Sequence, residues 1–382
     1  MSPVSALEQA RQLINADRLG RELDEAHLDA VVAVSPENTY YLSGAYIRTQ
    51  VSIRDRLALV VWPRSGEPTL IVCNIEESLV GRESWIKDVR TYVEFAQSPI
   101  NLLAAVLKER GLEGGRIGIE RRFLTVEYHD ELIEGFRAEF QPADQLLERV
   151  RAIKTPGEVE RIKHAFIETE AAIRAAWSET RAGDSEKQIA ERMAAEITRR
   201  GADAVRHITL ASGENTIHAH RRPSDRKLEP GDLLLTDFGG NWGGFCSDMA
   251  RMGVCGEPAA EAAVEFAKYR AAYVDTLQFL QPGVSAADVF NHCAEAFRRL
   301  GIELTSPHIG HSLSRGGGHE NPILHPFNQQ PLEEGMLIAL EPTFRPNDVR
   351  RYHLEDLILI TRGGREIMTD WKSTAEMIRI AT

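Results

Sequence analysis

Residues 183–201 and 283–301 repeat one another, and this repeat limits the folds open to the chain more than any other feature. The two segments align without a gap as GDSEKQIAERMAAEITRRG and GVSAADVFNHCAEAFRRLG. Each has a serine placed to cap the start of a helix and a glycine placed to end it. The repeat therefore predicts two equivalent helices in the C-terminal half of the chain.

A second pair of matching segments follows these helices in the same order. Gly231 and Gly335 each precede an apolar strand-like run, and an acid stands six residues after each glycine, at Asp237 and Glu341. Helix-plus-glycine patterns also arise by chance, but two matches in the same order favour an internal duplication. A duplicated α/β unit would bring its two acid-tipped strands together about a pseudo-two-fold axis.

Five acid and imidazole side chains form a candidate metal-binding set near that axis. Four carboxylates and one imidazole suit one or two divalent ions of hard or borderline character, such as manganese, cobalt, iron or zinc. Without metal, the clustered carboxylates would raise one another's pKa, and two dications would remove that repulsion and activate water. The alternative is five ordinary strand-end or loop residues. The set comprises Asp237, Asp248, His311, Glu341 and Glu355.

Two further histidines are candidates for catalysis rather than for metal binding. His220 and His319 each lie between the repeated helix and the acid-tipped strand of one half, and the five-residue set leaves them free for proton transfer. Each could donate a proton to a developing oxyanion or to a leaving amine. His218 and His308 stand close to these positions in the sequence, and for at least one of the two a structural role is the simpler interpretation.

Composition excludes several classes of partner. The 382 residues carry a net charge of −12, which disfavours nucleic acid and anionic membranes. The sequence has no run of 18 apolar residues and no signal-peptide pattern at its start. The cysteines show no CxxC spacing. These features together predict a cytoplasmic protein.

The chain is long enough for two domains, and the sequence predicts a boundary near residue 150. Residues 1–150 alternate helix-like and strand-like patterns, which indicates an α/β domain with a mixed sheet. Within it, residues 6–26 are predicted to form one amphipathic helix, and residues 29–36 a strand that Pro36 ends. Residues 151–382 form the predicted second domain. Its first helix is predicted to begin with a capping box at Thr155 and to stop at Gly183.

The motifs along the chain resemble those of the pita-bread metallohydrolases, the family of Xaa-Pro aminopeptidase, prolidase, methionine aminopeptidase and creatinase. The resemblance covers essentially the whole chain, and the motifs are specific when taken together. They are NTYYLSG (38–44), ASGENTIHAH (211–220), TDFGGNWGGFCSDMAR (236–251), GHSLSRGGGHENP (310–322), LEPTF (340–344) and HLEDLILIT (353–361).

This resemblance implies a creatinase-like N-terminal domain, a pita-bread catalytic domain and a homodimer. It implies two divalent ions, with manganese favoured and cobalt, zinc or iron as alternatives. Asp248 and Glu355 would bridge the ions, Asp237 would chelate one, and His311 and Glu341 would complete the other. Glu341 would also take a proton from the attacking water, and the substrate would contact the two catalytic histidines, His220 and His319.

The chain departs from the family pattern at positions that shape the substrate pocket. The usual Gly-His-Gly-Ile-Gly is Gly-His-Ser-Leu-Ser at residues 310–314, and the loop up to His319 is one residue longer. Ala250, Pro307 and His353 replace a usual Thr, His and Arg. The five metal ligands are retained, so the departures bear on substrate choice rather than on metal binding.

Three functional hypotheses follow. The first is a metallo-exopeptidase that cleaves Xaa-Pro bonds as a dipeptidase or aminopeptidase. The second is a metal-dependent hydrolase or lyase of a small zwitterion that resembles ectoine, creatine or dimethylsulfoniopropionate. The third, a binding module without catalysis, is disfavoured because no ligand is lost.

Arg345, Arg350 and Arg351 lie near the last ligands and are candidates for binding a substrate carboxylate, or form a solvated basic loop.

Overall fold

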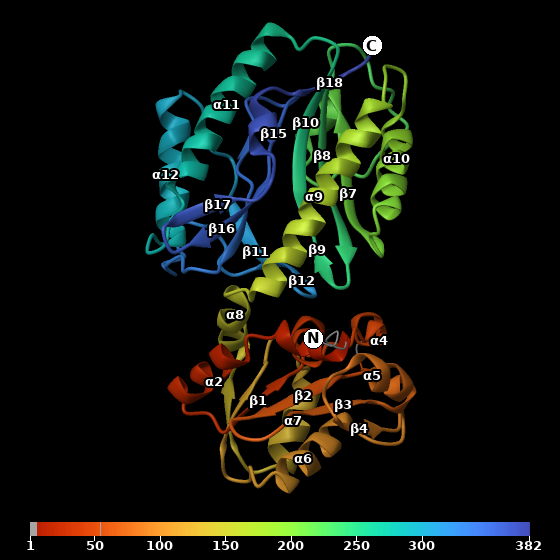
Figure 1. Cartoon of the computed structure of the whole chain (residues 1–382), viewed down its shortest axis with the longest axis vertical. Coiled ribbons are helices and arrows are strands. Elements are labelled where there is room, and N and C mark those ends of the chain that lie inside the picture. Colours follow the sequence, from red (N-terminus) through yellow and green to blue (C-terminus); the bar gives the residue numbers. More distant parts are fainter. Residues whose placement is uncertain (1–5, 54) are drawn as a thin grey trace, which may run out of the picture. The chain divides into compact units, whose positions relative to one another are not determined.

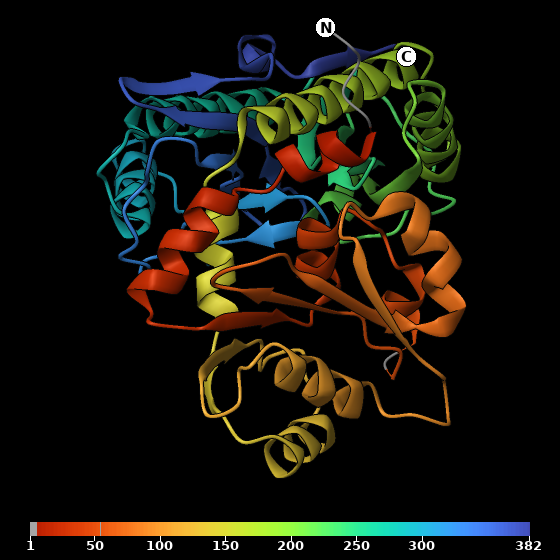
Figure 2. The same cartoon turned by 60° about the horizontal axis from the view of Figure 1, so that its bottom comes forward.

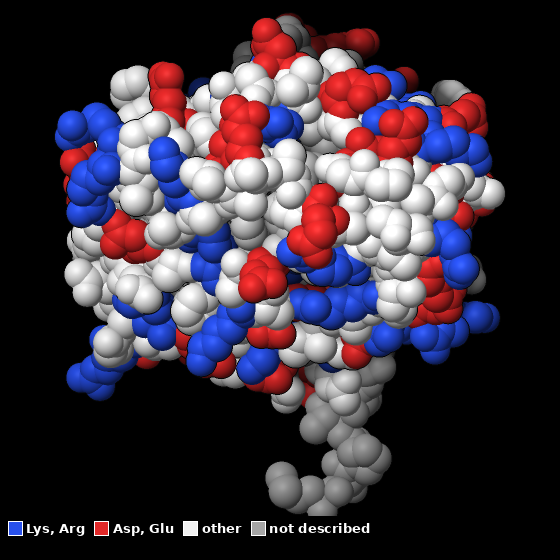
Figure 3. Space-filling model, turned by 90° about the horizontal axis from the view of Figure 1, so that it is seen from above, with Lys and Arg blue, Asp and Glu red and all other residues white. Residues whose placement is uncertain are grey.

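The computed structural model describes residues 6–53 and 55–382, and the chain divides between Arg151 and Ala152 into two compact units (Figure 1). Among the described residues, no helix combines the length and the apolar character needed to cross a membrane. Acidic and basic side chains are intermixed over the face of the molecule shown in Figure 3.

The N-terminal unit is built on one six-stranded mixed sheet in the order β4-β3-β2-β1-β5-β6. Strand β1 pairs antiparallel with β2 and parallel with β5, as the mixed α/β prediction requires. The strands are β1 (Ala30–Ala33), β2 (Leu59–Pro63), β3 (Thr69–Cys73), β4 (Asp88–Tyr92), β5 (Arg116–Ile119) and β6 (Glu139–Pro142). The helices are α1 (Ala6–Gln12), α2 (Ala16–Glu25), α3 (Pro36–Ser43), α4 (Arg48–Ser52), α5 (Glu77–Glu83), α6 (Pro99–Glu109), α7 (Val126–Gly135) and α8 (Asp144–Ala152).

Two local predictions for this unit are wrong. The single helix expected over residues 6–26 is two helices, because the Asn15 side chain accepts a hydrogen bond from the Arg18 backbone N–H and so starts α2 anew. Pro36 does not end a strand but is the first residue of α3, which Ser35 caps. Proline favours the first helical turn, where no backbone N–H donor is needed.

The C-terminal unit contains two five-stranded sheets, ordered β18-β10-β8-β7 with β9 beside β8, and β12-β11-β13-β16-β17. Helices α9 and α10 lie beside the first sheet and α11 and α12 beside the second (Figures 1 and 2). These helices are α9 (Pro156–Ser178), α10 (Glu186–Arg199), α11 (Ala260–Phe279) and α12 (Ala286–Arg299). The strands are β7 (Ala204–Ser212), β8 (Leu233–Trp242), β9 (Phe245–Cys246), β10 (Met249–Cys255), β11 (Gly310–Ser314), β12 (Gly317–Glu320), β13 (Leu337–Leu340), β14 (Thr343–Phe344), β15 (Tyr352–His353), β16 (Asp356–Thr361), β17 (Gly364–Ile367) and β18 (Ile378–Ile380).

The predicted duplication is visible in matching backbone contacts of the two halves. Ser185 and Ser285 cap α10 and α12, each within a capping box. The Gly183 N–H donates to the Leu228 carbonyl at 2.8 Å, and the Gly283 N–H donates to the Leu332 carbonyl at 2.8 Å. Equivalent hydrogen bonds thus join the residues before α10 and α12 to the segments that precede β8 and β13. Gly183 does not end α9, which stops at Ser178.

The boundary of the first helix of this unit follows the prediction. Thr155 accepts a hydrogen bond from the Glu158 N–H, and the Glu158 side chain accepts one from the Thr155 N–H, which is the expected capping box. A continuous cluster of buried apolar side chains then joins α11 and α12 to β13 and β16. This core fixes the strands that carry the candidate ligands.

Candidate metal centre

Asp237 and Asp248 come from neighbouring strands of the first sheet. Asp237 does not end its strand, as the sequence suggested, but lies in the middle of β8, opposite Thr209 of β7 and Ala250 of β10. The strand continues to Trp242, and the chain reverses at Gly243 and Gly244. Asp248 directly precedes β10, so the antiparallel pairing places both carboxylates close together.

The second sheet repeats this arrangement. Glu341 directly follows β13, and Glu355 directly precedes β16, its antiparallel partner. His311 lies on β11, opposite Ala339 of β13. Each sheet thus supplies two acids from a pair of antiparallel strands.

The structure brings all five predicted residues into one cluster. In each of three overlapping groups, the possible ligand atoms lie within 4.8 Å of one another. Asp248 and His311 each belong to two groups and so connect the halves. The groups are His207, Asp237 and Asp248; Asp248, His311 and His319; and His311, Glu341 and Glu355.

Unpaired buried atoms show that this cluster fits a cation. The His311 ring donates through Nδ1 to the Ser312 carbonyl at 3.0 Å, and its buried Nε2 has no hydrogen-bond partner among the described residues. In the same part of the chain, Glu341 Oε1 and both carboxylate oxygens of Glu355 are also buried without a hydrogen-bond partner. Such lone pairs are costly to bury unless something binds them, and a divalent ion would do so.

The charges in the cluster are unbalanced without metal. Burial and then the nearby Asp248, Glu341 and Asp237 carboxylates raise the pKa of Glu355 well above its usual value. For Asp237, burial favours the neutral acid, but the hydrogen bond from His207 outweighs it and lowers the pKa. The pKa of Glu341 is lowered in the same way, against burial, by His353. Cations are therefore the groups that stabilise this set of acids.

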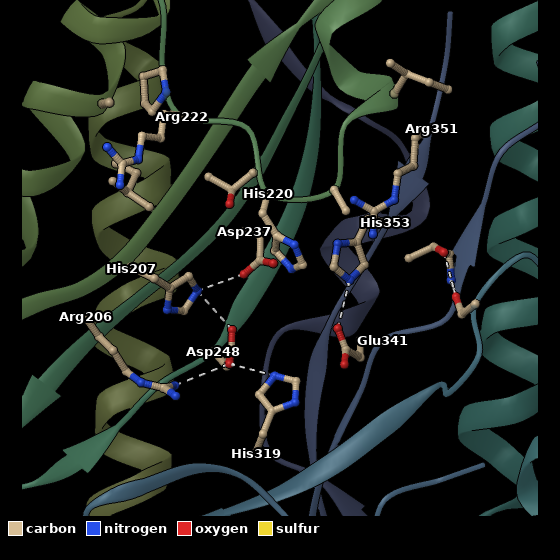
Figure 4. A pocket seen from close by; sticks show the side chains of 18 of the residues that line it. Arg206, His207, His220, Arg222, Asp237, Asp248, His319, Glu341, Arg351 and His353 are labelled. Carbon is tan, nitrogen blue, oxygen red and sulfur yellow. Dashed lines mark hydrogen bonds and ion pairs between the residues drawn. The ribbon is translucent and has the colours of Figure 1, made fainter. Parts of the chain in front are cut away.

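A pocket of about 1440 Å³ opens above the cluster. Its lining includes the predicted catalytic residues His220 and His319, together with Asp237, Asp248 and Glu341 (Figure 4). The His319 ring stacks on His311 with 3.6 Å between ring centroids. Burial lowers the pKa of His319, which favours the neutral ring.

Among the pocket residues that sequence reasoning missed, Arg206 and His207 contact the acids of the cluster. His207 Nε2 lies 2.8 Å from Asp237 Oδ1 and 3.0 Å from Asp248 Oδ1. Arg206 Nη1 lies 3.4 Å from Asp248 Oδ2. The alternation of side chains along a strand could have indicated His207. His207 stands two residues before Thr209, so both side chains lie on the same face of the sheet, and Thr209 pairs with Asp237 of β8.

The electrostatics of His207 follow from these contacts. Burial opposes a charge on the ring, but the hydrogen bonds with Asp237 and Asp248 outweigh burial and raise the pKa of His207 to about 9. The ring thus lies where positive charge is favoured.

Of the three arginines near the last ligands, Arg351 alone lines the pocket with a buried Nη1 that has no hydrogen-bond partner in the described part of the chain. Arg350 is held by Glu261 and Glu265 at 2.6 and 2.9 Å, and Arg345 is paired with Asp348 at 2.7 Å. His353, which replaces the usual Arg, lies 3.3 Å from Glu341 Oε2.

A network of buried, charged side chains around Arg251 supports the cluster. Arg251 pairs with Glu170 at 3.1 Å and with Asp356 at 2.9 Å. Its Nη1 also donates to the backbone carbonyl of Glu355 at 2.6 Å. Asp356 in turn accepts hydrogen bonds from Tyr273 and Thr369, each at 2.6 Å. The network therefore holds the backbone on both sides of the start of β16.

Models of known protein families match both parts of the chain. Residues 160–362 match the model of metallopeptidase family M24, and residues 16–153 match the creatinase/prolidase N-terminal domain. An uncharacterized peptidase of Staphylococcus epidermidis is 27% identical over 353 residues, which cover 92% of this chain and 97% of that protein. An uncharacterized peptidase of Staphylococcus saprophyticus is 26% identical over 359 residues, covering 93% and 99%.

Solved structures share the fold. The dipeptidase PepE from Mycobacterium ulcerans has a TM-score of 0.83 at 24% identity, covering 97% of this chain and 98% of its own. The Xaa-Pro dipeptidase from Bacillus anthracis has a TM-score of 0.82 at 23% identity, covering 98% and 100%. The X-Pro aminopeptidase from Thermotoga maritima has a TM-score of 0.82 at 23% identity, covering 96% and 99%. With the family match over residues 160–362, these findings confirm the resemblance, and the chain belongs to the pita-bread metallopeptidases of family M24.

Proposed function

We propose that this protein is a metal-dependent exopeptidase that cleaves the bond before proline, as a dipeptidase or an aminopeptidase. The observation that carries the proposal is the cluster of five acid and imidazole side chains, with buried unpaired oxygen and nitrogen atoms, at the base of a large pocket. Solved relatives named as Xaa-Pro dipeptidase and X-Pro aminopeptidase support it.

The proposed cofactor is a pair of divalent ions, manganese or one of the borderline ions cobalt, zinc and iron. Asp237 and Asp248 would hold one ion, and His311, Glu341 and Glu355 the other, with Asp248 and Glu355 shared. When bound, such ions supply Lewis acidity and lower the pKa of water near the scissile carbonyl.

Protein groups would position the substrate and move its protons. The low pKa of Glu341 keeps its carboxylate ionised, and Oε1, which has no hydrogen-bond partner, is the atom that would accept a proton from the attacking water. His220 and His319 line the pocket from opposite halves of the duplication and would donate to the oxyanion that forms on the scissile carbonyl.

Arg351 is the proposed anchor for the substrate carboxylate, because its buried Nη1 has no hydrogen-bond partner within residues 6–53 and 55–382. Arg351→Ala is expected to raise the KM of an Xaa-Pro dipeptide about 10- to 100-fold, the usual cost of a lost hydrogen bond to a charged group. The KM of the same dipeptide as its C-terminal amide is expected to stay unchanged. The matched control is Arg350→Ala, because Glu261 and Glu265 already hold that guanidinium. Equal KM values for the free dipeptide in the wild type and Arg351→Ala would exclude this role.

The second candidate function is a hydrolase or lyase of a small zwitterion, which the altered motif at residues 310–314 favours. The volume of the pocket favours a peptide substrate over a small zwitterion. A volume of about 1440 Å³ exceeds the roughly 300–1,000 Å³ of a typical small-molecule site, and a molecule the size of creatine would leave most of it filled by water.

The deciding experiment is hydrolysis by the full chain after reconstitution with manganese or cobalt. A panel of Xaa-Pro dipeptides, one longer Xaa-Pro peptide and matched Xaa-Ala peptides covers the alternatives. We expect turnover of Xaa-Pro substrates alone, and peptide length then separates dipeptidase from aminopeptidase. Two bound ions with no turnover of any peptide would reject the exopeptidase and favour the small zwitterion. The homodimer stays a prediction that light scattering checks.

A further inference from the structure

His207 points at the two aspartates of the cluster from a third strand. Its Nε2 lies 2.8 Å from Asp237 Oδ1 and 3.0 Å from Asp248 Oδ1, and Figure 4 shows the three side chains facing one another. None of the motifs that carry the family resemblance includes residue 207. The contact therefore needs its own explanation.

We propose that His207 is a direct ligand, through Nε2, of the metal ion that Asp237 and Asp248 hold. This inference rests on the proposed metal site and adds a residue to it. The cluster then has one imidazole for each ion, His207 for one and His311 for the other.

Ligand spacing supports direct coordination. Donor atoms about 2.1 Å from an ion lie about 3.0 Å apart when they occupy neighbouring octahedral positions. The two separations from His207 Nε2, 2.8 and 3.0 Å, agree with that value. A single ring N–H can point well at one acceptor, whereas a nitrogen lone pair and two carboxylate oxygens can all point at one shared cation.

The strands are shaped to admit this ring. His207 lies opposite Gly239 of β8, and a Cβ at residue 239 would come within 2.6 Å of the His207 ring carbon Cε1. The pairing of β7 with β8 also shifts register between Val205 and His207. Such a bulge changes the direction of neighbouring side chains, and both Arg206 and His207 line the pocket. The space for the imidazole thus comes from the backbone of both strands.

Arg206 does not compete with this role. Its guanidinium lies 3.4 Å from Oδ2 of Asp248, whereas His207 contacts Oδ1. The arginine therefore holds one carboxylate oxygen and leaves the other directed toward His207 and Asp237. An added nitrogen donor moves the preference of this ion from manganese toward cobalt and zinc, which bind imidazole more strongly.

Metal binding by the full chain tests the proposal without any activity measurement. Metal-stripped wild type, His207→Ala and the control His164→Ala, a histidine on α9 outside the pocket lining, would be titrated with zinc in a calorimeter. Loss of an outer partner of a ligand already costs about 10- to 100-fold in affinity. We expect His207→Ala to weaken one zinc ion by about 100-fold or more, and to leave the other ion and the control unchanged.

A crystal structure of the zinc-loaded wild type, with the ions located by anomalous scattering, covers the case in which His207→Ala fails to fold. We expect His207 Nε2 about 2.0–2.1 Å from one ion. A hydrogen bond to a carboxylate alone would leave Nε2 more than about 3 Å from either ion and would overturn the proposal. Zinc binding unchanged in His207→Ala would do the same.

These outcomes separate the two proposals. Bound zinc with Nε2 coordinated and no peptide cleavage would reject the peptidase and keep His207 as a ligand. Peptide cleavage with Nε2 away from both ions would keep the peptidase and reject His207 as a ligand. A wild-type protein that binds no ion would reject both.

Discussion

Asp248→Asn is expected to abolish metal-dependent peptide hydrolysis. Asp248 belongs to two of the three ligand groups, one with His207 and Asp237 and one with His311 and His319. Loss of an outer partner of a ligand costs about 10- to 100-fold. Loss of Asp248, which two ions are proposed to share, is therefore expected to lower kcat/KM for an Xaa-Pro substrate by a factor on the order of 10³ or more, and to lower the metal content.

This loss is separable from unfolding. The Asp248 carboxylate helps to raise the pKa of Glu355, after the larger effect of burial. Asparagine has the same shape and removes that repulsion, so the metal-free variant is expected to be as stable as the metal-free wild type. Thermal melts of both stripped proteins and elemental analysis of both loaded proteins check this.

The matched control is Asp275→Asn. Asp275 is a partly exposed residue of α11 that pairs with Arg299. The activity and metal content of this variant are expected to equal those of the wild type. If Asp248→Asn has the same metal content and activity as the wild type, Asp248 is not a metal ligand.

Arg251→Leu is expected to lower the free energy of unfolding by about 3–5 kcal/mol, because it leaves buried carboxylates without their partner. The Arg251 side chain is 1% exposed, and it pairs with Glu170 and Asp356, which are 9% and 0% exposed. Urea unfolding of the metal-stripped chain, followed by tryptophan fluorescence, measures the change.

Arg298→Leu is the control for the same substitution on the surface. Arg298 is 77% exposed and pairs with Glu295 on α12. Its removal is expected to change the free energy of unfolding by about 1 kcal/mol or less. Equal losses in the two variants would mean that burial of the Arg251 network contributes nothing beyond an exposed pair.

Features that depend on neighbouring residues in the sequence were predictable. The capping boxes at Thr155, Ser185 and Ser285 need a hydroxyl and an acid or amide three residues apart, and the sequence shows both. Gly231 and Gly335 adopt φ of +90° and +89°, as turn glycines before a strand do. Of the five clustered residues, Asp237 and Glu341 follow from the internal repeat.

Features that depend on pairing between strands were not predictable from local patterns. Asp237 was expected at a strand end because glycines follow it, but hydrogen bonds to β7 carry β8 on to Trp242. Arg206 lies at the register shift in β7, so regular strand alternation does not predict that it lines the pocket beside His207. Asn15 divides the first helix through one side-chain bond, where the apolar period alone suggested a continuous helix.

The origin of the ligands in two sheets has a consequence for how the chain folds. Asp237 and Asp248 belong to one half of the duplication, and Glu341 and Glu355 to the other, so neither half alone contains the complete set. Contacts between residues so distant in sequence form late, after the entropy of closing long loops has been overcome. Tight binding of both proposed ions during refolding would therefore begin only after the two halves have docked. The binding free energy of the ions would stabilise only the folded domain.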